Sequence, residues 1–523
     1  MNSPSKPFTP VSGPSESLIA AIEAFAAQAR RAYGASPRLV DDCLYQASLA
    51  FTARNYAGNV RIIRPLLVPI CNGRIDLGQQ ELVEDVLTVN VESCAAQYAV
   101  AMYMTSSERQ RVRALLVAID ELSHVGRFFK PIQELEQVCV EPLPGLDTFL
   151  EQWQALLEKV RCARVAAEAR RKLSNKAPQE LGGTGQLPYR QEDAIPRWAE
   201  PEEHNESEEP EEDALLSFYN RHPSQFADDW LREVVHRRES CAGLARLARR
   251  DRDRRDIQEW CRQVEHEGDW RATQLAYEEG SLLDPSSAEL CDSAALAIQV
   301  LGVEAPDPYL ERAWRTTPTL TRLLRWLGRC ETRAALLERC AIATDALPQD
   351  ALRQRGLLLV LQEDLPGAAA LLVEKAGADW HWDWHPGDLL MLVFAHLLGA
   401  QRLSPQSGLV RYEGVEANEH RPTLATPSLQ ALLERAEVHV GQHRSVLIEA
   451  MRAASTRWVD KVTQLKLRNR YSHAARFALL CSRVGATGQQ WLQELRAAYR
   501  GFPALSRAFV EAERAEHLTT ENG

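Results

Sequence analysis

The sequence lacks any long uninterrupted apolar segment. Its longest apolar runs, such as LLMLVFAHLLGA at 389–400, are shorter than the roughly 20 residues that a membrane-spanning helix needs. The first stretch, MNSPSKPFTPVSGPSES, is polar and rich in proline and serine, and it has no apolar region typical of a secretory signal. We therefore expect a disordered leader, no membrane segment and a cytoplasmic location.

Paired cysteine motifs are also missing. The eleven cysteines are scattered singly, without a CxxC pair or a repeated spacing. Structural metal sites and disulfide frameworks depend on such spacings. The cysteines therefore indicate reduced core residues of an intracellular protein, and no cofactor is expected.

The motifs of the common enzyme classes are absent. The chain has no GxxxxGK[ST] phosphate loop, no GxSxG nucleophile elbow, no HExxH zinc motif and no GxGxxG after a strand. The net charge of −11, from 61 basic and 72 acidic residues, argues against non-specific nucleic-acid binding by the chain as a whole. These absences favour a protein that is not an enzyme.

What the sequence does contain is helical periodicity over most of its 523 residues. A chain of this length exceeds a single hydrophobic core, so at least two domains are expected. The segment from Ser174 to Asp213 interrupts the helical pattern with Gly, Pro and a dense acidic run. We predict an all-α protein with a disordered leader at 1–14, an N-terminal helical domain at 15–173, an acidic linker at 174–213, a C-terminal helical-repeat domain at 214–515 and a disordered tail at 516–523.

The C-terminal domain is predicted to be an α-solenoid. In the stretch 264–291, a small-residue turn is followed by a helix and then by a second helix that starts near a proline, a layout that resembles tetratricopeptide repeats. About four more short helices follow in 308–378. Because such pairs cannot bury their apolar faces alone, stacking into a TPR-like or HEAT-like array is expected. No fixed repeat period is found.

An unusual loop precedes the apolar helix at 389–400. Three tryptophans alternate there with potential metal ligands, in the order Trp380, His381, Trp382, Asp383, Trp384 and His385. In an extended backbone, the alternation would place the tryptophans on one face and His, Asp and His on the other, which are ligand types for a divalent metal. A structural interpretation, in which the tryptophans fix the loop to the helices, is favoured because a fourth ligand and a general base are missing.

A basic stretch at 457–483 is the other candidate for chemistry. It contains Lys461, Lys466, Arg468, Arg470 and Arg476, with Tyr471 among them. Cations interleaved with aromatic side chains are typical of phosphate-binding faces in nucleic-acid-binding proteins. A solvated helix surface is the favoured interpretation, and a nucleic-acid-associated module is the alternative.

Two stretches carry a family resemblance. The tryptophan-rich loop ends in His385, Pro386 and Gly387 and leads into an apolar helix, and the chain closes with WVDKV, RNRYSHAARFALLCSRV and WLQELRAAYRGFPALSRAFVEA. Over residues 375–515 the chain resembles bacterial proteins whose helical region accompanies a SWIM-type zinc finger or stands alone. The resemblance implies a helical repeat that holds partners in a bacterial multi-protein system. The CxC and CxH pairs of the finger are absent, so zinc-dependent nucleic-acid binding is not implied.

The sequence therefore predicts a non-enzymatic scaffold that binds protein partners. Trp380, Trp382, Trp384 and Tyr471 are candidate anchors if their side chains are exposed, because aromatic residues dominate the energetics of interfaces. Two alternatives stay open at this point. One is a nucleic-acid-associated module that uses the basic residues of 457–483, and the other is a metal-dependent enzyme centred on His381, Asp383 and His385.

Overall fold

The described part of the chain is all-α, as predicted. The computed structural model describes residues 13–78, 82–122, 130–176, 226–302, 305–376, 385–401, 403 and 422–521. These residues form 23 α-helices and no strand. Among them, one isolated β-bridge joins Gly34 and Asp76. None of the described helices combines the length and the hydropathy that crossing a membrane requires.

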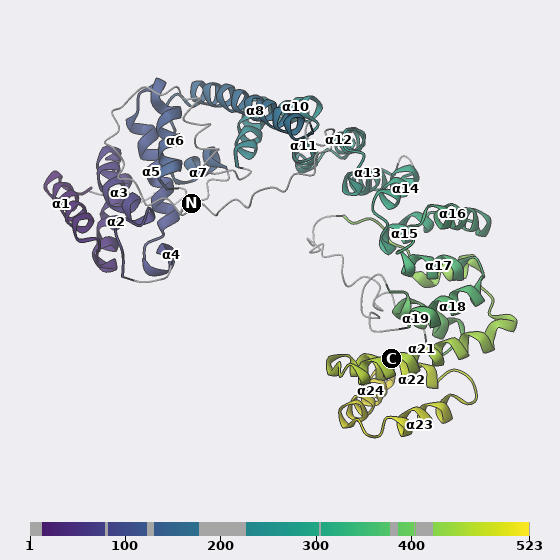
Figure 1. The fold of residues 1–523 in the computed structure, drawn as a ribbon. Coiled ribbons are helices and arrows are strands. Elements are labelled where there is room, and N and C mark those ends of the chain that lie inside the picture. The colour runs from purple at the N-terminus through teal and green to yellow at the C-terminus, as the bar shows by residue number, and fades with distance from the viewer. Residues whose placement is uncertain are drawn as a thin grey trace, which may run out of the picture. The chain divides into compact units, whose positions relative to one another are not determined.

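Contacts divide the chain into two compact units, Met1–Leu247 and Ala248–Gly523. In the first unit, α3 packs against α1, α2 and α5, and α5 also packs against α2, α6 and α7, so these two helices lie at the centre of a bundle (Figure 1). The helices of this unit are α1 (Glu16–Ala32), α2 (Pro37–Thr52), α3 (Tyr56–Cys71), α4 (Val83–Val86), α5 (Val91–Thr105), α6 (Arg111–Glu121), α7 (Pro131–Val138), α8 (Leu146–Lys176) and the first part of α10 (Phe226–Asp251).

A row of aromatic rings joins three helices of the first unit. Tyr103 of α5 lies edge-on to Phe149 of α8, with ring centroids 5.1 Å apart. Phe149 stacks on Trp153 of the same helix at 6.0 Å, and Trp153 stacks on Trp230 of α10 at 5.7 Å. Both tryptophans are almost completely buried. The start of α10 is therefore part of the core of the N-terminal unit.

A buried carboxylate makes the second connection to α10. Glu233 accepts hydrogen bonds from the backbone N–H groups of Ile132 and Gln133, at 3.3 and 2.7 Å. These amides lie in the first turn of α7, where backbone N–H groups have no partner within the helix. Burial raises the pKa of Glu233 to about 7, although both hydrogen bonds favour the charged form. Glu233 thus caps α7 from a helix about a hundred residues further along the chain.

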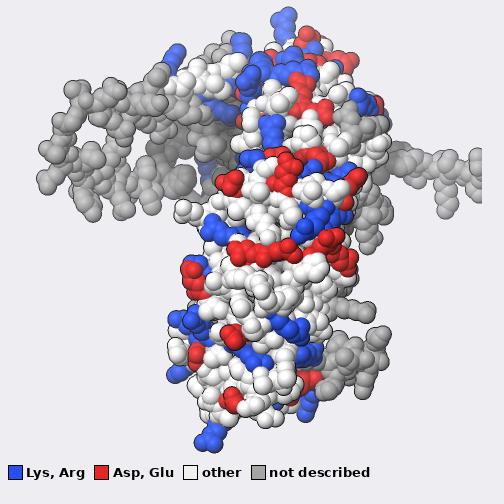
Figure 2. Space-filling view, turned by 90° about the vertical axis from the view of Figure 1, so that its right-hand side faces the viewer, with Lys and Arg blue, Asp and Glu red and all other residues white. Residues whose placement is uncertain are grey.

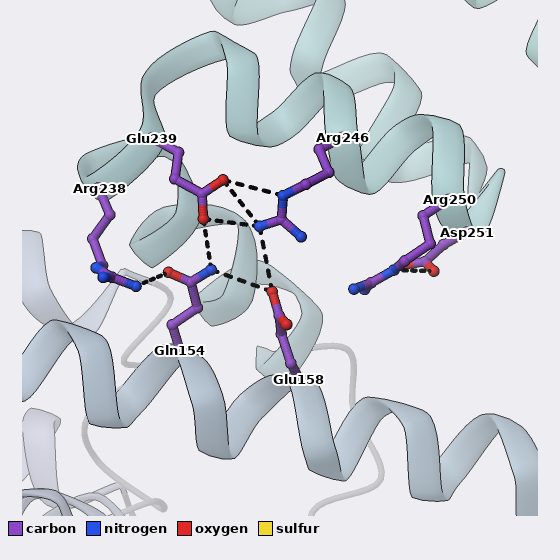
Figure 3. A network of polar contacts seen from close by, with 7 residues as sticks. All are labelled: Gln154, Glu158, Arg238, Glu239, Arg246, Arg250 and Asp251. Carbon is purple, nitrogen blue, oxygen red and sulfur yellow. Dashed lines mark hydrogen bonds and ion pairs between the residues drawn. The ribbon is translucent and has the colours of Figure 1, made fainter.

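A polar network ties α10 to α8 beyond the aromatic row (Figure 3). The backbone of α10 is kinked at Ser240, where φ is 53°. Next to the kink, Glu239 accepts hydrogen bonds from Gln154 of α8 and from Arg246, each at 2.8 Å. Burial alone would raise the pKa of Glu239, but these hydrogen bonds hold it below its ordinary value. The kink at Ser240 therefore lets Arg246, which follows it, bind the ionised carboxylate of Glu239, which precedes it.

These contacts bear on the predicted domain boundary. The sequence predicts a C-terminal domain from residue 214 onward, whereas contacts group α10 as far as Leu247 with the N-terminal unit. The predicted linker 174–213 lies outside the described residues, except for 174–176 at the end of α8. The leader 1–14 lies outside them except for residues 13 and 14, as do residues 522 and 523 of the predicted tail.

In the second unit, most helices pack against the helix that follows them in the chain (Figure 1). The series runs from α11 to α19, and the closing helices α21 and α22 pack against α18 and α19. The helices are α11 (Arg254–His266), α12 (Trp270–Leu283), α13 (Ala288–Leu301), α14 (Asp307–Thr316), α15 (Leu320–Leu327), α16 (Arg333–Ala346), α17 (Leu352–Leu361), α18 (Leu365–Lys375), α19 (Gly387–Leu397), α20 (Leu429–Ala436), α21 (Arg444–Gln464), α22 (Tyr471–Ser482), α23 (Gly488–Ala498) and α24 (Pro503–Glu521).

Short polar residues start many of these helices. The carboxylate of Asp269 accepts hydrogen bonds from the N–H groups of Arg271 and Ala272, and so begins α12. Asp253 and Asp364 begin α11 and α18 in the same way. A side-chain oxygen at this position satisfies amides that lack a partner within the helix. The turns predicted from Gly, Asp and Pro are therefore the points at which one helix of the series ends and the next begins.

A buried amide organises the middle of the second unit. Trp314 of α14 stacks on Trp326 of α15 with ring centroids 5.3 Å apart, and both are buried. The indole N–H of Trp314 donates to the side-chain oxygen of Gln354 in α17 at 2.8 Å. The amide nitrogen of Gln354 donates in turn to the carbonyl of Pro318 at 2.9 Å. Three helices and one connection are thus held together by one satisfied polar group in an apolar core.

The burial of Glu233 predicts a pH dependence of stability. Because its pKa rises from 4.5 to about 7 on folding, the folded chain holds this proton more tightly than the unfolded chain does. The resulting stabilisation is complete below pH 4.5 and is lost as the pH rises through 7. In urea unfolding at a series of pH values, Glu233→Gln should flatten the decline, since the amide keeps an acceptor oxygen and does not titrate. The exposed Glu92→Gln variant is the control, and an equal change in both variants would contradict this assignment.

Candidate functional site

The predicted Trp and His loop lies mostly outside the described residues. Trp380, His381, Trp382, Asp383 and Trp384 belong to that part of the chain, so the three candidate tryptophan anchors and two of the candidate metal ligands stay predictions. The structure describes the chain again from the last residue of the motif.

That residue, His385, joins the ends of two helices. Its side chain is 2% exposed. The Nδ1 atom accepts a hydrogen bond from the N–H of Gly387, in the first turn of α19, at 2.9 Å. The proton of the neutral ring therefore lies on Nε2, which donates to the carbonyl of Lys375, the last residue of α18, at 2.6 Å. The His-Pro-Gly sequence thus closes a gap between two helix ends.

This arrangement changes the metal hypothesis for His385. A histidine binds a metal through the lone pair of a ring nitrogen, and both nitrogens of His385 are engaged with the backbone. Among the described residues, no group of three or more His, Cys, Asp or Glu side chains is placed to hold a metal ion. His385 is therefore a capping residue in this structure, and its assignment as a candidate metal ligand stays a prediction.

A second histidine lies next to this junction. His473 of α22 has its Nε2 atom 3.1 Å from Oδ1 of Asp388, in the first turn of α19. The ring lies edge-on to Trp458 and to Phe477, with centroids 6.0 and 4.7 Å away. In a catalytic triad, the other ring nitrogen would accept a proton from a nucleophile. The Nδ1 atom of His473 is buried and has no such partner among the described residues, so the pair connects α19 to α22.

Tyr471 is not available as an exposed anchor. Its side chain is 4% exposed and belongs to the hydrophobic core of the second unit. Trp458, another aromatic residue of the basic stretch, is completely buried. The aromatic residues of 457–483 therefore hold α21 and α22 together, and Tyr471 does not meet the condition of exposure that its role as an anchor requires.

The five basic residues of the alternative site are at the surface. Lys461, Lys466, Arg468 and Arg476 are exposed, and Arg470 is half-buried. Lys461 lies in the last turn of α21, the next three residues lie in the connection to α22, and Arg476 lies in the second turn of α22. Since a helical turn rises about 5.4 Å, all five belong to the same end of this helix pair.

These cations differ from most other arginines of the second unit. Arg249 makes a two-pronged ion pair with Glu279, at 2.6 and 2.8 Å, and Arg322 pairs with Asp292 at 2.8 Å. On the face drawn in Figure 2, blue and red side chains lie next to one another in many places. In contrast, none of the five predicted cations makes a side-chain hydrogen bond or an ion pair with a residue that the structure describes.

Three buried thiols of the second unit are protonated apolar groups. All eleven cysteines are free, and six are buried, whereas the sequence predicts that all of them lie in the core. Burial raises the pKa of Cys261, Cys340 and Cys481 to about 12. A nucleophilic cysteine needs a lowered pKa, because the thiolate is the reactive form. These three buried thiols are therefore protonated at neutral pH and serve as small apolar groups.

A further surface feature was not predicted. Leu275 and Leu282 of α12 are 54% and 70% exposed. They are seven residues apart, so they lie one above the other on a single face of the helix. The sequence shows their spacing but not their exposure, because the same spacing is typical of core residues.

Polar contacts join α12, the helix that carries these leucines, to two other helices. Glu279 of α12 pairs with Arg249 of α10, and the carbonyl of Ser281 accepts a hydrogen bond from Arg312 of α14. These two contacts join α12 to α10 and to α14. The two exposed leucines therefore lie on a helix that polar contacts hold in place on two sides.

The comparisons with known proteins do not assign the chain. No protein-family model matches it, and no curated protein matches it significantly. The resemblance to the helical region of SWIM-associated bacterial proteins therefore stays a prediction.

If His385 caps the two helix ends, its substitution should lower the stability of the chain and should not change the binding of a metal ion. We expect His385→Ala to destabilise the chain by about 2–4 kcal/mol, because the buried N–H of Gly387 and the partly buried carbonyl of Lys375 lose their partner. His385→Asn should cost less, since its carbonyl oxygen can still accept from Gly387. Urea unfolding measures both effects. An increase in the melting temperature of the unaltered chain on addition of Zn²⁺, absent in His385→Ala, would instead restore the metal hypothesis.

Proposed function

We propose that this chain is a helical-repeat scaffold whose second unit binds a protein partner, and that the exposed face of α12 is part of the binding surface. The observation that carries this proposal is the pair of large leucine side chains, Leu275 and Leu282, held in solvent on one helix face. Binding would remove them from water. Full burial of a leucine is worth about 1.5–3 kcal/mol, so the two are suited to act as central contacts.

The surroundings of the two leucines support an interface. Arg271 lies four residues before Leu275 and is exposed, and Glu278 lies between the two leucines on the same side of α12. An apolar centre with a charged rim is the usual composition of a protein interface. The partner that fits is a protein segment with apolar side chains at its centre and charges of both signs around them.

The helical series supplies a rigid support for this surface. Most helices of this unit pack against the helix that follows them in the chain, and α12 is also joined to α10 by an ion pair and to α14 by a hydrogen bond. Binding to a preorganised surface costs less conformational entropy than binding that must first order the surface. An α-solenoid with TPR-like or HEAT-like pairs is the architecture that we propose for this unit. In this proposal the chain acts by binding and not by catalysis, and it is located in the cytoplasm.

The proposal predicts that removal of the two leucines abolishes capture of a partner. The full chain and its Leu275→Ser, Leu282→Ser double variant are immobilised and exposed to a lysate of the native cell. A protein retained by the unaltered chain and lost by the variant is then purified, and its affinity is measured. We expect a loss of about tenfold or more for each leucine, from the apolar area that is no longer buried.

The matched control replaces two apolar residues that are exposed elsewhere in the same unit. Ile342 and Val446 are 38% and 39% exposed, so Ile342→Ser with Val446→Ser changes a similar kind of surface. The control should retain the partner. If the leucine variant and the control retain the same proteins as the unaltered chain, the face of α12 is not the binding surface.

A further inference from the structure

The strongest unassigned feature is a positively charged surface at one end of the closing helices. We define this basic end as Lys461, Lys466, Arg468, Arg470 and Arg500. The first four belong to the end of α21 and its connection to α22, and Arg500 belongs to the turn between α23 and α24. Arg500 is exposed, and like the other four it has no ion-pair partner among the described residues.

One hydrogen bond brings the two turns together. The hydroxyl of Tyr499 donates to Oδ1 of Asp460 in the last turns of α21. Tyr499 directly precedes Arg500, and Asp460 directly precedes Lys461. Figure 1 shows the α21–α22 connection and the α23–α24 turn at the same end of these helices. Cations that are about 40 residues apart in the chain therefore share one surface.

Carboxylates are almost absent from this part of the chain. From Lys461 to Val510 the sequence has nine Lys and Arg residues and one acidic residue, Glu494. The local charge is therefore about +8 in a chain whose net charge is −11. Asp460, the acidic residue next to this stretch, is engaged by the hydroxyl of Tyr499. None of the five cations of the basic end makes an ion pair with a carboxylate of the described residues, whereas Arg249 and Arg322 do.

Apolar side chains are exposed among the cations. Leu465, at the end of α21, is 50% exposed, and Phe502, in the α23–α24 turn, is 38% exposed. The ring of Phe502 lies 6.2 Å from the ring of Tyr499. An aromatic ring that is partly open to solvent beside a set of cations can stack on a nucleobase while the cations contact phosphates.

We propose that the basic end binds the sugar-phosphate backbone of a single-stranded nucleic acid and that Phe502 stacks on one of its bases. Several separate cations fit the repeated charges of a polymer better than a single phosphate group. Aromatic stacking requires an unpaired base, which a single strand offers and a duplex does not. The surface has this function in addition to the protein binding proposed for α12, and the two are tested by different variants.

Lys466 offers a substitution that removes charge and preserves the turn. Its φ is 54°, and its N–H donates to the carbonyl of Thr463 at 3.2 Å. The N–H of Leu467 donates to the carbonyl of Val462 at 2.8 Å, which completes the usual hydrogen-bond pattern of a helix C-terminus. Glycine is the favoured residue at this left-handed position. Lys466→Gly should therefore fold at least as stably as the unaltered chain.

The test measures binding of a fluorescent oligothymidylate of about 30 nucleotides by anisotropy, at salt concentrations from about 0.05 to about 0.3 M. The unaltered full chain should bind, and log K should fall with log salt with a slope of about −3.5 for five contacts. The double variant Lys466→Gly, Arg468→Gln should bind about 25-fold more weakly at 0.1 M salt, with a slope reduced by about 1.4. Phe502→Ala should weaken binding with little change in slope.

The control variant removes two cations elsewhere in the same unit. Arg255 and Arg444 are exposed, without ion-pair partners among the described residues, so Arg255→Gln with Arg444→Gln matches the charge change. The control should bind as the unaltered chain does, and circular dichroism should show that all variants are folded. The proposal is overturned if the unaltered chain does not bind at the lowest salt, or if test and control variants lose affinity equally. It is also overturned if polyglutamate or anionic lipid vesicles bind the basic end more tightly than the oligonucleotide does.

Discussion

The second unit depends on one constraint, which is that none of its helices can bury an apolar face alone. Helices α11 to α19 are short, and isolated helices of this length are marginally stable in water. Each becomes stable only when its neighbour covers it, and the resulting core extends from Ala295 in α13 to Ala512 in α24. Local stability therefore depends on the neighbours on both sides, and the end helices depend on the last pair.

Buried polar side chains solve a second problem, which is created by so many helix ends. Each end leaves backbone groups without partners inside the helix. Glu233 supplies acceptors to the start of α7, His385 satisfies the end of α18 and the start of α19, and Gln354 accepts from an indole and donates to a backbone carbonyl. In each case, one side chain forms directional hydrogen bonds between two elements. Apolar contacts are non-directional, so they do not by themselves fix the relative position of these elements.

The sequence predicts the helical class because the apolar spacing is a local property. Turns could be placed for the same reason, since residues such as Asp269 cap a helix within a few positions of themselves. The membership of α10 in the first unit could not be predicted, because it follows from Trp230 and Glu233 contacting residues far away in the sequence. The alternation around His385 suggests a metal ligand, whereas its actual partner is a backbone carbonyl, which carries no sequence signal. Exposure of the basic residues was predicted, but the position of Arg500 beside them depends on the bond between Tyr499 and Asp460.

The stretch from Lys461 to Val510, with nine basic residues and one acidic residue, makes the charge distribution of the molecule uneven. At long range a polyanion meets a chain of net charge −11 and is repelled, whereas at short range it meets a local excess of about eight positive charges. Near physiological salt, the Debye length is about 8 Å, so distant acidic residues are screened while contacts at the surface are not. Moderate salt therefore weakens the long-range repulsion between the acidic residues and an anionic polymer. The short-range attraction of the closing helices is weakened less, so it favours contact on that side.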